Sequence, residues 1–537
     1  RALGRNSPGR LPTSTAKMTS RSAGRRFPTW LPVRLVALGR CLLLAGGSLA
    51  PPPMNDFRYT NALGGSTLTH RGEFFEVYSQ PFTLQYAEAL HTFEEPLYLP
   101  QAIQERFQGR TMAVTGYETN WEIQDARSGQ WRAAKSTEGY VHHYQLYMFS
   151  SRAPPDVVER NLHPNDDSPW QKHQGRRAVP ARAPLVQTFM EGNGNENRGS
   201  FHGLPKGFVQ LVDSPSYFRN LYHVINTVNP SGSASWGPGT AAPLPRASAA
   251  LPGAPYSGLI ECPCSTRRGD YQRTGVMAKD APHNTSGDPF KSLCLPGGEL
   301  RKQRNPICDQ ETYSGGLQCC AQGMVMLDVD QAIPAERSTF RAHLRFYFED
   351  PETLAEPPRE AFFLFAETED WQSEYDIPAL PPPSVHVLER HFRARDLFGG
   401  LLGWNSPHRF NCSRVTTAMC GGLLEVEAAG GEFELRYAHF HQHVGMLGGA
   451  LINADTGDLL CETHGIYGTG DEPLNERGYV VAIPPCIWEG PEAPKLRLDS
   501  NLTSIARYNA TMKHLAVMAM WEMRGALLSR SAPGMLI

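Results

Sequence analysis

After residue 50 the sequence lacks any apolar run approaching the roughly 18 residues that a membrane-spanning helix needs, so we expect a soluble chain with no membrane span. The sequence also lacks a large excess of positive or negative charge. The net charge is −3 over 537 residues, which indicates neither nucleic acid nor an acidic lipid surface as a partner. Long segments with a 3.6-residue apolar period are scarce, and we find no internal repeat, so a helical bundle is not indicated.

Short strand-like segments take the place of helices. Brief aromatic and β-branched runs are separated by turns that draw on 50 glycines and 44 prolines, a composition typical of an all-β protein. In FRAHLRFYFED, apolar residues alternate with Arg341, His343 and Arg345, as in a half-buried strand. The length allows two large all-β domains. We therefore predict two antiparallel, jelly-roll-like β-sandwich domains.

The domain boundaries follow changes in composition. Residues 151–200 are polar and proline-rich, which predicts a long surface loop, and residues 230–258 are of low complexity, which predicts a flexible insertion. The predicted order is a leader at 1–53, an N-terminal sandwich at 54–376, a proline-rich connector at 377–387, a C-terminal sandwich at 388–526 and a tail at 527–537.

The N-terminal region resembles a secretory leader. From Met18 a basic segment precedes the apolar stretch LVALGRCLLLAGG, and the small residues GSLA suggest cleavage near Ala50. We therefore expect a secreted, extracellular protein. A disordered basic tail or an organelle leader is the alternative.

The cysteines agree with secretion. Removing Cys41 with the leader leaves an even set of ten, in one group of six and one of four: Cys262, Cys264, Cys294, Cys308, Cys319 and Cys320, then Cys412, Cys420, Cys461 and Cys486. We predict disulfides within each group, with a zinc site at Cys262 and Cys264 as the alternative. Sequons for glycosylation begin at Asn284, Asn411, Asn501 and Asn509.

The segment GEFELRYAHFHQHVGMLGG, residues 431–449, carries a row of histidines. At period two, one strand face would hold Phe433, Leu435, Tyr437, His439, His441 and His443. Because this face begins with apolar residues, we expect the imidazoles to be buried, where they need partners. A His-x-His pair offers two nitrogens to one copper, zinc, iron or nickel ion. Core histidines satisfied by other side chains are the alternative.

Four other candidate residues are ambiguous when taken singly. His142 and His143 are adjacent in GYVHHYQLYMF, and neighbours on a strand point to opposite faces, so both can bind one ion only at a strand end or a bulge. His223, in FRNLYHVINTV, and Met512, before an apolar run, would each pass for core residues.

Together these motifs resemble the copper type II, ascorbate-dependent monooxygenases (peptidylglycine and dopamine hydroxylases). The resemblance implies two copper ions in separate domains, with ascorbate as the reductant. The electron-transfer copper would be bound by His142, His143 and His223, and the oxygen-binding copper by His441, His443 and Met512. A register shift would replace His443 by His439. The thioether of Met512 suits Cu(I).

A closer resemblance over roughly residues 130–525, in ECPCSTRRGD, SGGLQCC, AHFHQHVG and GDLLCETHGIYGTGDEP, is to the stress up-regulated nodulin (Nod-nineteen) family. The peptidylglycine enzymes bind the substrate carboxylate with an arginine and a tyrosine, where this sequence has His439 (or Tyr437) and Ala516. Peptide amidation is therefore not expected, and the substrate class stays open. The alternative to an enzyme is a non-catalytic extracellular or cell-wall glycoprotein on the same scaffold.

Overall fold

The computed structural model describes residues 54–55, 57–65, 67–153, 184–190, 194–228, 325, 335–368, 375–398, 418–511 and 514–528. Its described part is built mainly from antiparallel strands, with two short α-helices, α1 (Gln101–Arg106) and α4 (Ala418–Ala428). The prediction of an all-β protein is confirmed, whereas the jelly-roll detail stays a prediction. Among the described residues, no helix is both long and apolar enough to cross a membrane.

The N-terminal half contains two packed sheets. One has the order β1-β13-β5-β10-β14, with β2, β6 and β9 attached, and the other has the order β3-β12-β7-β11-β4, with β8 attached. Their strands are β1 (Glu73–Tyr78), β2 (Phe82–Gln85), β3 (Ala89–Phe93), β4 (Leu97–Tyr98), β5 (Thr111–Gln124), β6 (Trp131–Ala133), β7 (Gly139–Ser150), β8 (Val186–Met190), β9 (His202–Gly203), β10 (Phe208–Asp213), β11 (Pro215–Phe218), β12 (Leu221–Asn226), β13 (Arg337–Glu349) and β14 (Arg359–Glu360). Side chains from both sheets fill the core between them.

The alternation predicted for residues 340–348 is present in β13. Phe340, Leu344 and Phe346 are buried in the N-terminal core, while Arg345 pairs with Glu76 on the other face. Since a strand alternates its side chains between two faces, this pattern alone fixes which side of β13 meets the core.

The C-terminal half also contains two main sheets, with the orders β15-β27-β18-β23, to which β24 is attached, and β17-β25-β19-β20. Their strands, with two smaller pairs, are β15 (Phe362–Glu367), β16 (Tyr375–Ile377), β17 (Val385–Arg393), β18 (Glu432–Gln442), β19 (Met446–Asn453), β20 (Leu459–Thr463), β21 (Ile466–Tyr467), β22 (Val480–Ala482), β23 (Cys486–Ile487), β24 (Lys495–Arg497), β25 (Asn501–Asn509), β26 (His514–Val517) and β27 (Ala519–Leu527). Three 3-10 turns complete the described elements: η2 (Asn195–Gly199), η5 (Pro351–Thr353) and η6 (Ala394–Leu397).

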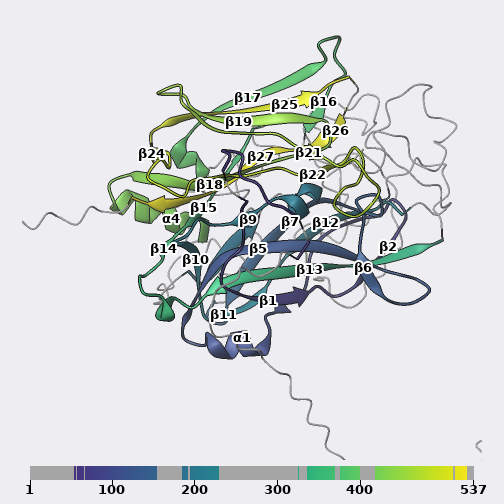
Figure 1. The fold of residues 1–537 in the computed structure, drawn as a ribbon, viewed down its shortest axis with the longest axis horizontal. Coiled ribbons are helices and arrows are strands. Elements are labelled where there is room, and N and C mark those ends of the chain that lie inside the picture. The colour runs from purple at the N-terminus through teal and green to yellow at the C-terminus, as the bar shows by residue number, and fades with distance from the viewer. Residues whose placement is uncertain are drawn as a thin grey trace, which may run out of the picture. The chain divides into compact units, whose positions relative to one another are not determined.

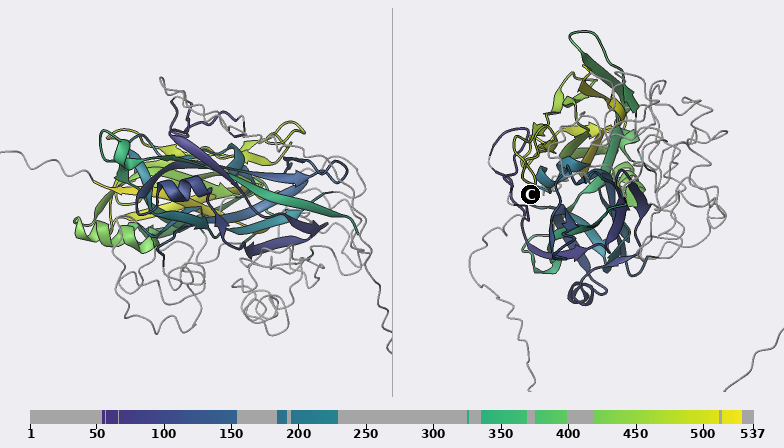
Figure 2. Two further views of the ribbon diagram at one scale, coloured as in Figure 1. Left: turned by 90° about the horizontal axis from the view of Figure 1, so that it is seen from below. Right: turned by 90° about the vertical axis from the view of Figure 1, so that its right-hand side faces the viewer.

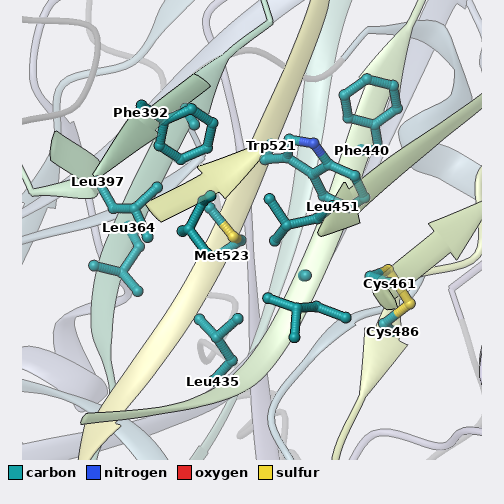
Figure 3. Close-up of a cluster of buried hydrophobic side chains, with 14 of the residues drawn as sticks. Leu364, Phe392, Leu397, Leu435, Phe440, Leu451, Cys461, Cys486, Trp521 and Met523 are labelled. Atoms are coloured by element: carbon teal, nitrogen blue, oxygen red, sulfur yellow. A yellow bond between two sulfur atoms is a disulfide. The ribbon is translucent and has the colours of Figure 1, made fainter. Parts of the chain in front are cut away.

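The core of the C-terminal half lies between these two sheets. Figure 3 shows Leu435, Phe440 and Met523 from one sheet facing Leu451 from the other. The disulfide Cys461–Cys486 lies beside this core and joins β20 to β23, and so joins the two sheets. It pairs two cysteines of the group predicted for this half. The other predicted disulfides lie outside the residues whose side chains are described.

The two halves are in direct contact. In Figure 1, β17, β25 and β19 lie at the top, β18 and β15 lie below them, and β5 and β13 lie lower still. Helix α4 lies at one end of the strands (Figures 1 and 2). Buried side chains from both halves, such as Phe201 and Tyr437, form a small core between them.

The strand pairing bears on the predicted boundary. β15 pairs with the last strand, β27, and Ile377 at the end of β16 is buried in the C-terminal core. Strands of the C-terminal half therefore begin at Phe362, before the predicted connector at 377–387. The exact division into domains stays a prediction, and the insertion at 230–258 lies outside the described residues.

The prediction of a surface loop over residues 151–200 is wrong for its described C-terminal part. There β8 pairs with β7, and all five residues of η2 are buried. Polar composition was misleading because Asn195, Glu196 and Arg198 of η2 find buried hydrogen-bond or ion-pair partners.

Candidate metal centre

A β-bulge on β7 brings His142 and His143 together. His223 on β12 pairs with His143, but the next residue, Val224, pairs with Val141, so His142 is the extra residue. The bulge cancels the alternation that would separate two neighbours. The Nδ1 atoms of the two rings lie 3.3 Å apart. The sequence indicated that both histidines could bind one ion only at a bulge or a strand end, and the structure has a bulge at this position.

Three histidines form a row across neighbouring strands. His223 pairs with His143 on one side and with His91 of β3 on the other. Their neighbours Leu90, Tyr144 and Tyr222 are buried in the N-terminal core, so alternation directs the histidines to the opposite face of the sheet. All three histidines are buried. His91 was not predicted, because only the pairing of β3 with β12 brings it to the row.

The spacing of the ring nitrogens fits a metal ion. Two ligands about 2.0–2.1 Å from one tetrahedral ion lie roughly 3.3 Å apart. Nδ1 of His143 lies 3.3 Å from Nδ1 of His142 and 3.4 Å from Nδ1 of His223. Nitrogens of His91, His143 and His223 all lie within 4.8 Å of one another. Imidazole nitrogens in this arrangement suit copper or zinc.

A second bulge determines which way the histidines of β18 point. Leu435 pairs with Gly525 and Tyr437 with Arg524, so Arg436 is the extra residue. Phe433 and Leu435 are buried in the C-terminal core, and so are Ala438 and Phe440 rather than Tyr437. The prediction of one continuous face from Phe433 to His443 is therefore wrong, because the bulge reverses the alternation. The expected burial is confirmed, since His439, His441 and His443 are all buried.

The bulge directs His441 toward the N-terminal half. His443, which follows β18, lies with its ring centroid 4.5 Å from that of His142 and 5.1 Å from that of His441. The histidines predicted for two metal sites thus form one continuous cluster. Among the described residues, Nε2 of His441 and both ring nitrogens of His443 are buried without a hydrogen-bond partner. Such atoms cost about 1–3 kcal/mol each unless a ligand pairs with them.

Glu196 of η2 contacts His441 and was not predicted. Its Oε1 lies 2.6 Å from Nδ1 of His441, and both side chains are buried. The turn approaches closely: a Cβ on Gly194 would lie 2.7 Å from the carbonyl oxygen of His142 and 2.9 Å from Cε1 of His441. Only glycine fits there. A carboxylate on one ring nitrogen holds the imidazole in the orientation that presents the other nitrogen to an ion.

An ion pair between the halves anchors η2. Arg198 lies 3.0 Å from Glu476, and both side chains are almost fully buried. Ser136 donates its backbone N–H to Glu476, while its hydroxyl accepts from Arg198 and Asn195. This network ties the turn that carries Glu196 to both halves of the chain.

Burial favours the neutral form of three imidazoles in the cluster. Burial, followed by His443 and His143, holds the pKa of His142 well below the usual 6.5. Burial and the adjacent His142 and His91 do the same to the pKa of His223, and burial and His441 lower the pKa of His443. Burial raises the pKa of Glu196, but the nearby His441 outweighs this, so the net pKa is lowered. Neutral imidazoles are the form that binds metal ions.

His439 lies apart from the other histidines of β18. Its ring is 5.4 Å from that of His202, centroid to centroid, and burial lowers its pKa to about 4. His202 lines a small cavity between the halves, together with Tyr437 and Glu522. The ring that meets His142 is that of His443, which follows β18. Met512 lies outside the described residues.

The fold and this cluster define an all-β protein with a buried, histidine-rich candidate metal centre between its two halves. Residues 423–526 match the family model described as Stress up-regulated Nod 19, so this segment of the chain is similar to that family. The matched segment includes His441 and His443 but not the histidines of β7 and β12. No curated protein matches the chain.

Proposed function

We propose that the chain is a secreted copper protein of the ascorbate-dependent monooxygenase type, which hydroxylates a C–H bond of a substrate still to be identified. The observation that carries this proposal is the short distance from the buried Nδ1 of His143 to Nδ1 of His142, 3.3 Å, and to Nδ1 of His223, 3.4 Å. Secretion is supported by the leader-like sequence before Ala50 and by the buried disulfide.

Each group of histidines would hold one ion. His142, His143 and His223 would hold the first, and His441 and His443, with Met512, the second. Copper held in this way would supply one-electron redox chemistry and the activation of O2. One turnover consumes a C–H bond, O2 and two electrons with two protons from ascorbate, and yields an alcohol, water and dehydroascorbate.

The protein's own groups prepare the site. Burial keeps water from the cluster, and the lowered pKa values of His142, His223 and His443 keep their rings neutral and ready to bind. Glu196 holds Nδ1 of His441 and so directs Nε2 away from itself. Contact between His443 and His142 supports the register with His441 and His443, rather than His439 and His441, as ligands.

Copper stoichiometry and oxygen uptake test this proposal. We expect the chain without its leader to bind two copper ions after reconstitution, and to consume oxygen when ascorbate is added with a substrate. His143→Ala should abolish binding at the first site, while His391→Ala, on the exposed edge of β17, should have no effect. Absence of copper binding would refute the proposal. Copper binding without oxygen consumption across a broad set of substrates would favour the non-catalytic glycoprotein.

The role of Met512 needs its own test. Met512→Leu conserves volume, so the free energy of unfolding should change by less than about 1.5 kcal/mol. Because the thioether is lost, Cu(I) affinity should fall at the second site and remain unchanged at the first. Unchanged Cu(I) affinity at both sites would remove Met512 from the ligand set.

A further inference from the structure

His91 is the histidine of the cluster that no motif accounts for. It lies on β3 and is 3% exposed, and its ring stacks on that of His223, with centroids 4.4 Å apart and planes 7° from parallel. It meets the ring of His143 edge-on at 5.2 Å. We propose that His91 is a fourth imidazole ligand of the first metal site, a role that rests on the proposed function because it requires that this site bind copper.

The strand pairing places His91 in line with His223 and His143. His91, His223 and His143 occupy directly paired positions on three neighbouring strands, which places their side chains on one face in one row. Their nitrogens already lie within 4.8 Å of one another. Binding one ion requires the ring of His91 to turn out of its parallel stack on His223, because the lone pair of an imidazole lies in the plane of its ring. Rotation about the broad terminal torsion of histidine can supply this change.

Four imidazole ligands at the first site would give the two metal sites different functions. A metal site whose positions are filled by protein ligands is closed to small molecules, whereas a site with three protein ligands keeps a position open. The first site would then hold its ion without binding O2 and serve electron transfer alone. Oxygen chemistry would be confined to the second site, beside Glu196.

The test isolates the first site in the full chain. The parent for this experiment carries His441→Ala and His443→Ala, so that only the first site remains, and Cu(II) alone is the probe. We expect pulsed EPR of this parent to report four imidazole nitrogens. His91→Gly should lower Cu(II) affinity by about 10–100-fold or more and reduce the count to three. Azide should bind to the copper of this variant but not to that of the parent, and added imidazole should restore the parent spectrum.

Controls separate the outcomes. His391→Gly, at a side chain that is 71% exposed, should leave affinity and spectrum unchanged. If His91→Gly keeps the affinity and spectrum of its parent, the inference is wrong while the proposed function stands. If neither the parent nor the unaltered chain binds Cu(II), the proposed function fails and the inference with it. If His91→Gly does not fold, the count in the unaltered chain decides: three nitrogens at the first site refute the role of His91, and four support it.

Discussion

At the scale of single residues, Glu196 has the clearest influence on the candidate metal centre. Glu196→Gln keeps the shape of the side chain and an oxygen that can accept from Nδ1 of His441, but it removes the charge that strengthens this contact. We expect metal affinity at the second site to fall by about 10–100-fold, with the first site unaffected. Isothermal titration with Cu(II) would measure this.

The matched control for Glu196→Gln is Glu432→Gln, on the exposed start of β18. It should leave metal binding unchanged. Equal affinities for Glu196→Gln and the unaltered chain would mean that Glu196 is not needed to orient His441.

The buried carboxyl group of Glu94 should make the stability of the chain depend on pH. Burial raises its pKa to about 8, although Tyr222 and Asn220 donate to it. Its pKa is higher in the folded state than in the unfolded state, so the folded state holds the proton more tightly. This group's contribution to stability is therefore full below about pH 4.5 and is lost as the pH rises toward 8.

The variant Glu94→Gln should not show this loss of stability with rising pH. At about 1.4 kcal/mol per pKa unit, the free energy of unfolding of the unaltered, metal-free chain should fall by at most about 5 kcal/mol between pH 4.5 and 8 through this group. Urea unfolding at both pH values would measure the slope, which should be smaller in the variant. Glu105→Gln, on the surface of α1, should keep the full slope.

The candidate residues differ in how far sequence could reveal them. Strand geometry alone required a bulge or strand end for His142 and His143 to act together, and the bulge is present. His91 and Glu196 could not be found in this way. Their places depend on the pairing of β3 with β12 and on the burial of η2, and no local spacing encodes either contact.

At the scale of elements, β13 and β18 show why periodicity succeeds or fails. The period-two pattern of β13 identified its buried face over residues 340–348. In β18 the apolar core positions change from odd numbers, Phe433 and Leu435, to even numbers, Ala438 and Phe440. That change is itself the signal of a bulge, because an uninterrupted strand keeps its apolar residues on one face.

The disulfide Cys461–Cys486, which joins β20 to β23, should stabilise the folded chain. It closes a loop with a sequence separation of 25 residues, so replacing both cysteines by serine should lower the free energy of unfolding by about 3 kcal/mol. Chemical denaturation would measure the difference. Equal stability with and without the disulfide would contradict the expectation.

At the scale of the whole molecule, the ion pair Arg198–Glu476 joins the two halves. Glu476→Gln would leave Arg198 buried without its counter-charge, and breaking a buried pair typically costs about 3–5 kcal/mol. We expect a loss of that order in the free energy of unfolding. Asp499→Asn, in an exposed pair with Arg497, should produce no measurable change.

The same pair predicts a response to acid. Burial raises the pKa of Glu476, but Arg198 outweighs it and the net pKa lies below 4.5. The contribution is therefore present above about pH 4.5 and lost as the pH falls through the folded pKa. The stability difference between Glu476→Gln and the unaltered chain should narrow below that pH. A constant difference down to pH 3 would contradict this.

The fold class could be predicted for the whole chain, but the contact between its halves could not. Composition and alternation gave an all-β protein, since they reflect how each strand meets its own core. The contact between His142 and His443 joins residues about 300 positions apart. The resemblance to the monooxygenases implied metal ions in separate domains, whereas the predicted histidine ligands from both halves lie in one cluster. The number of ions stays a prediction.

The spread of the cluster along the chain has a consequence for biosynthesis. The row of His91, His143 and His223 depends on strands of the N-terminal half, the last large one being β13, which ends at Glu349. The strand that carries His441 lies beside β27, which ends at Leu527. If the N-terminal strands fold as they leave the ribosome, His91, His143 and His223 can come together while the strand that carries His441 is still being synthesised.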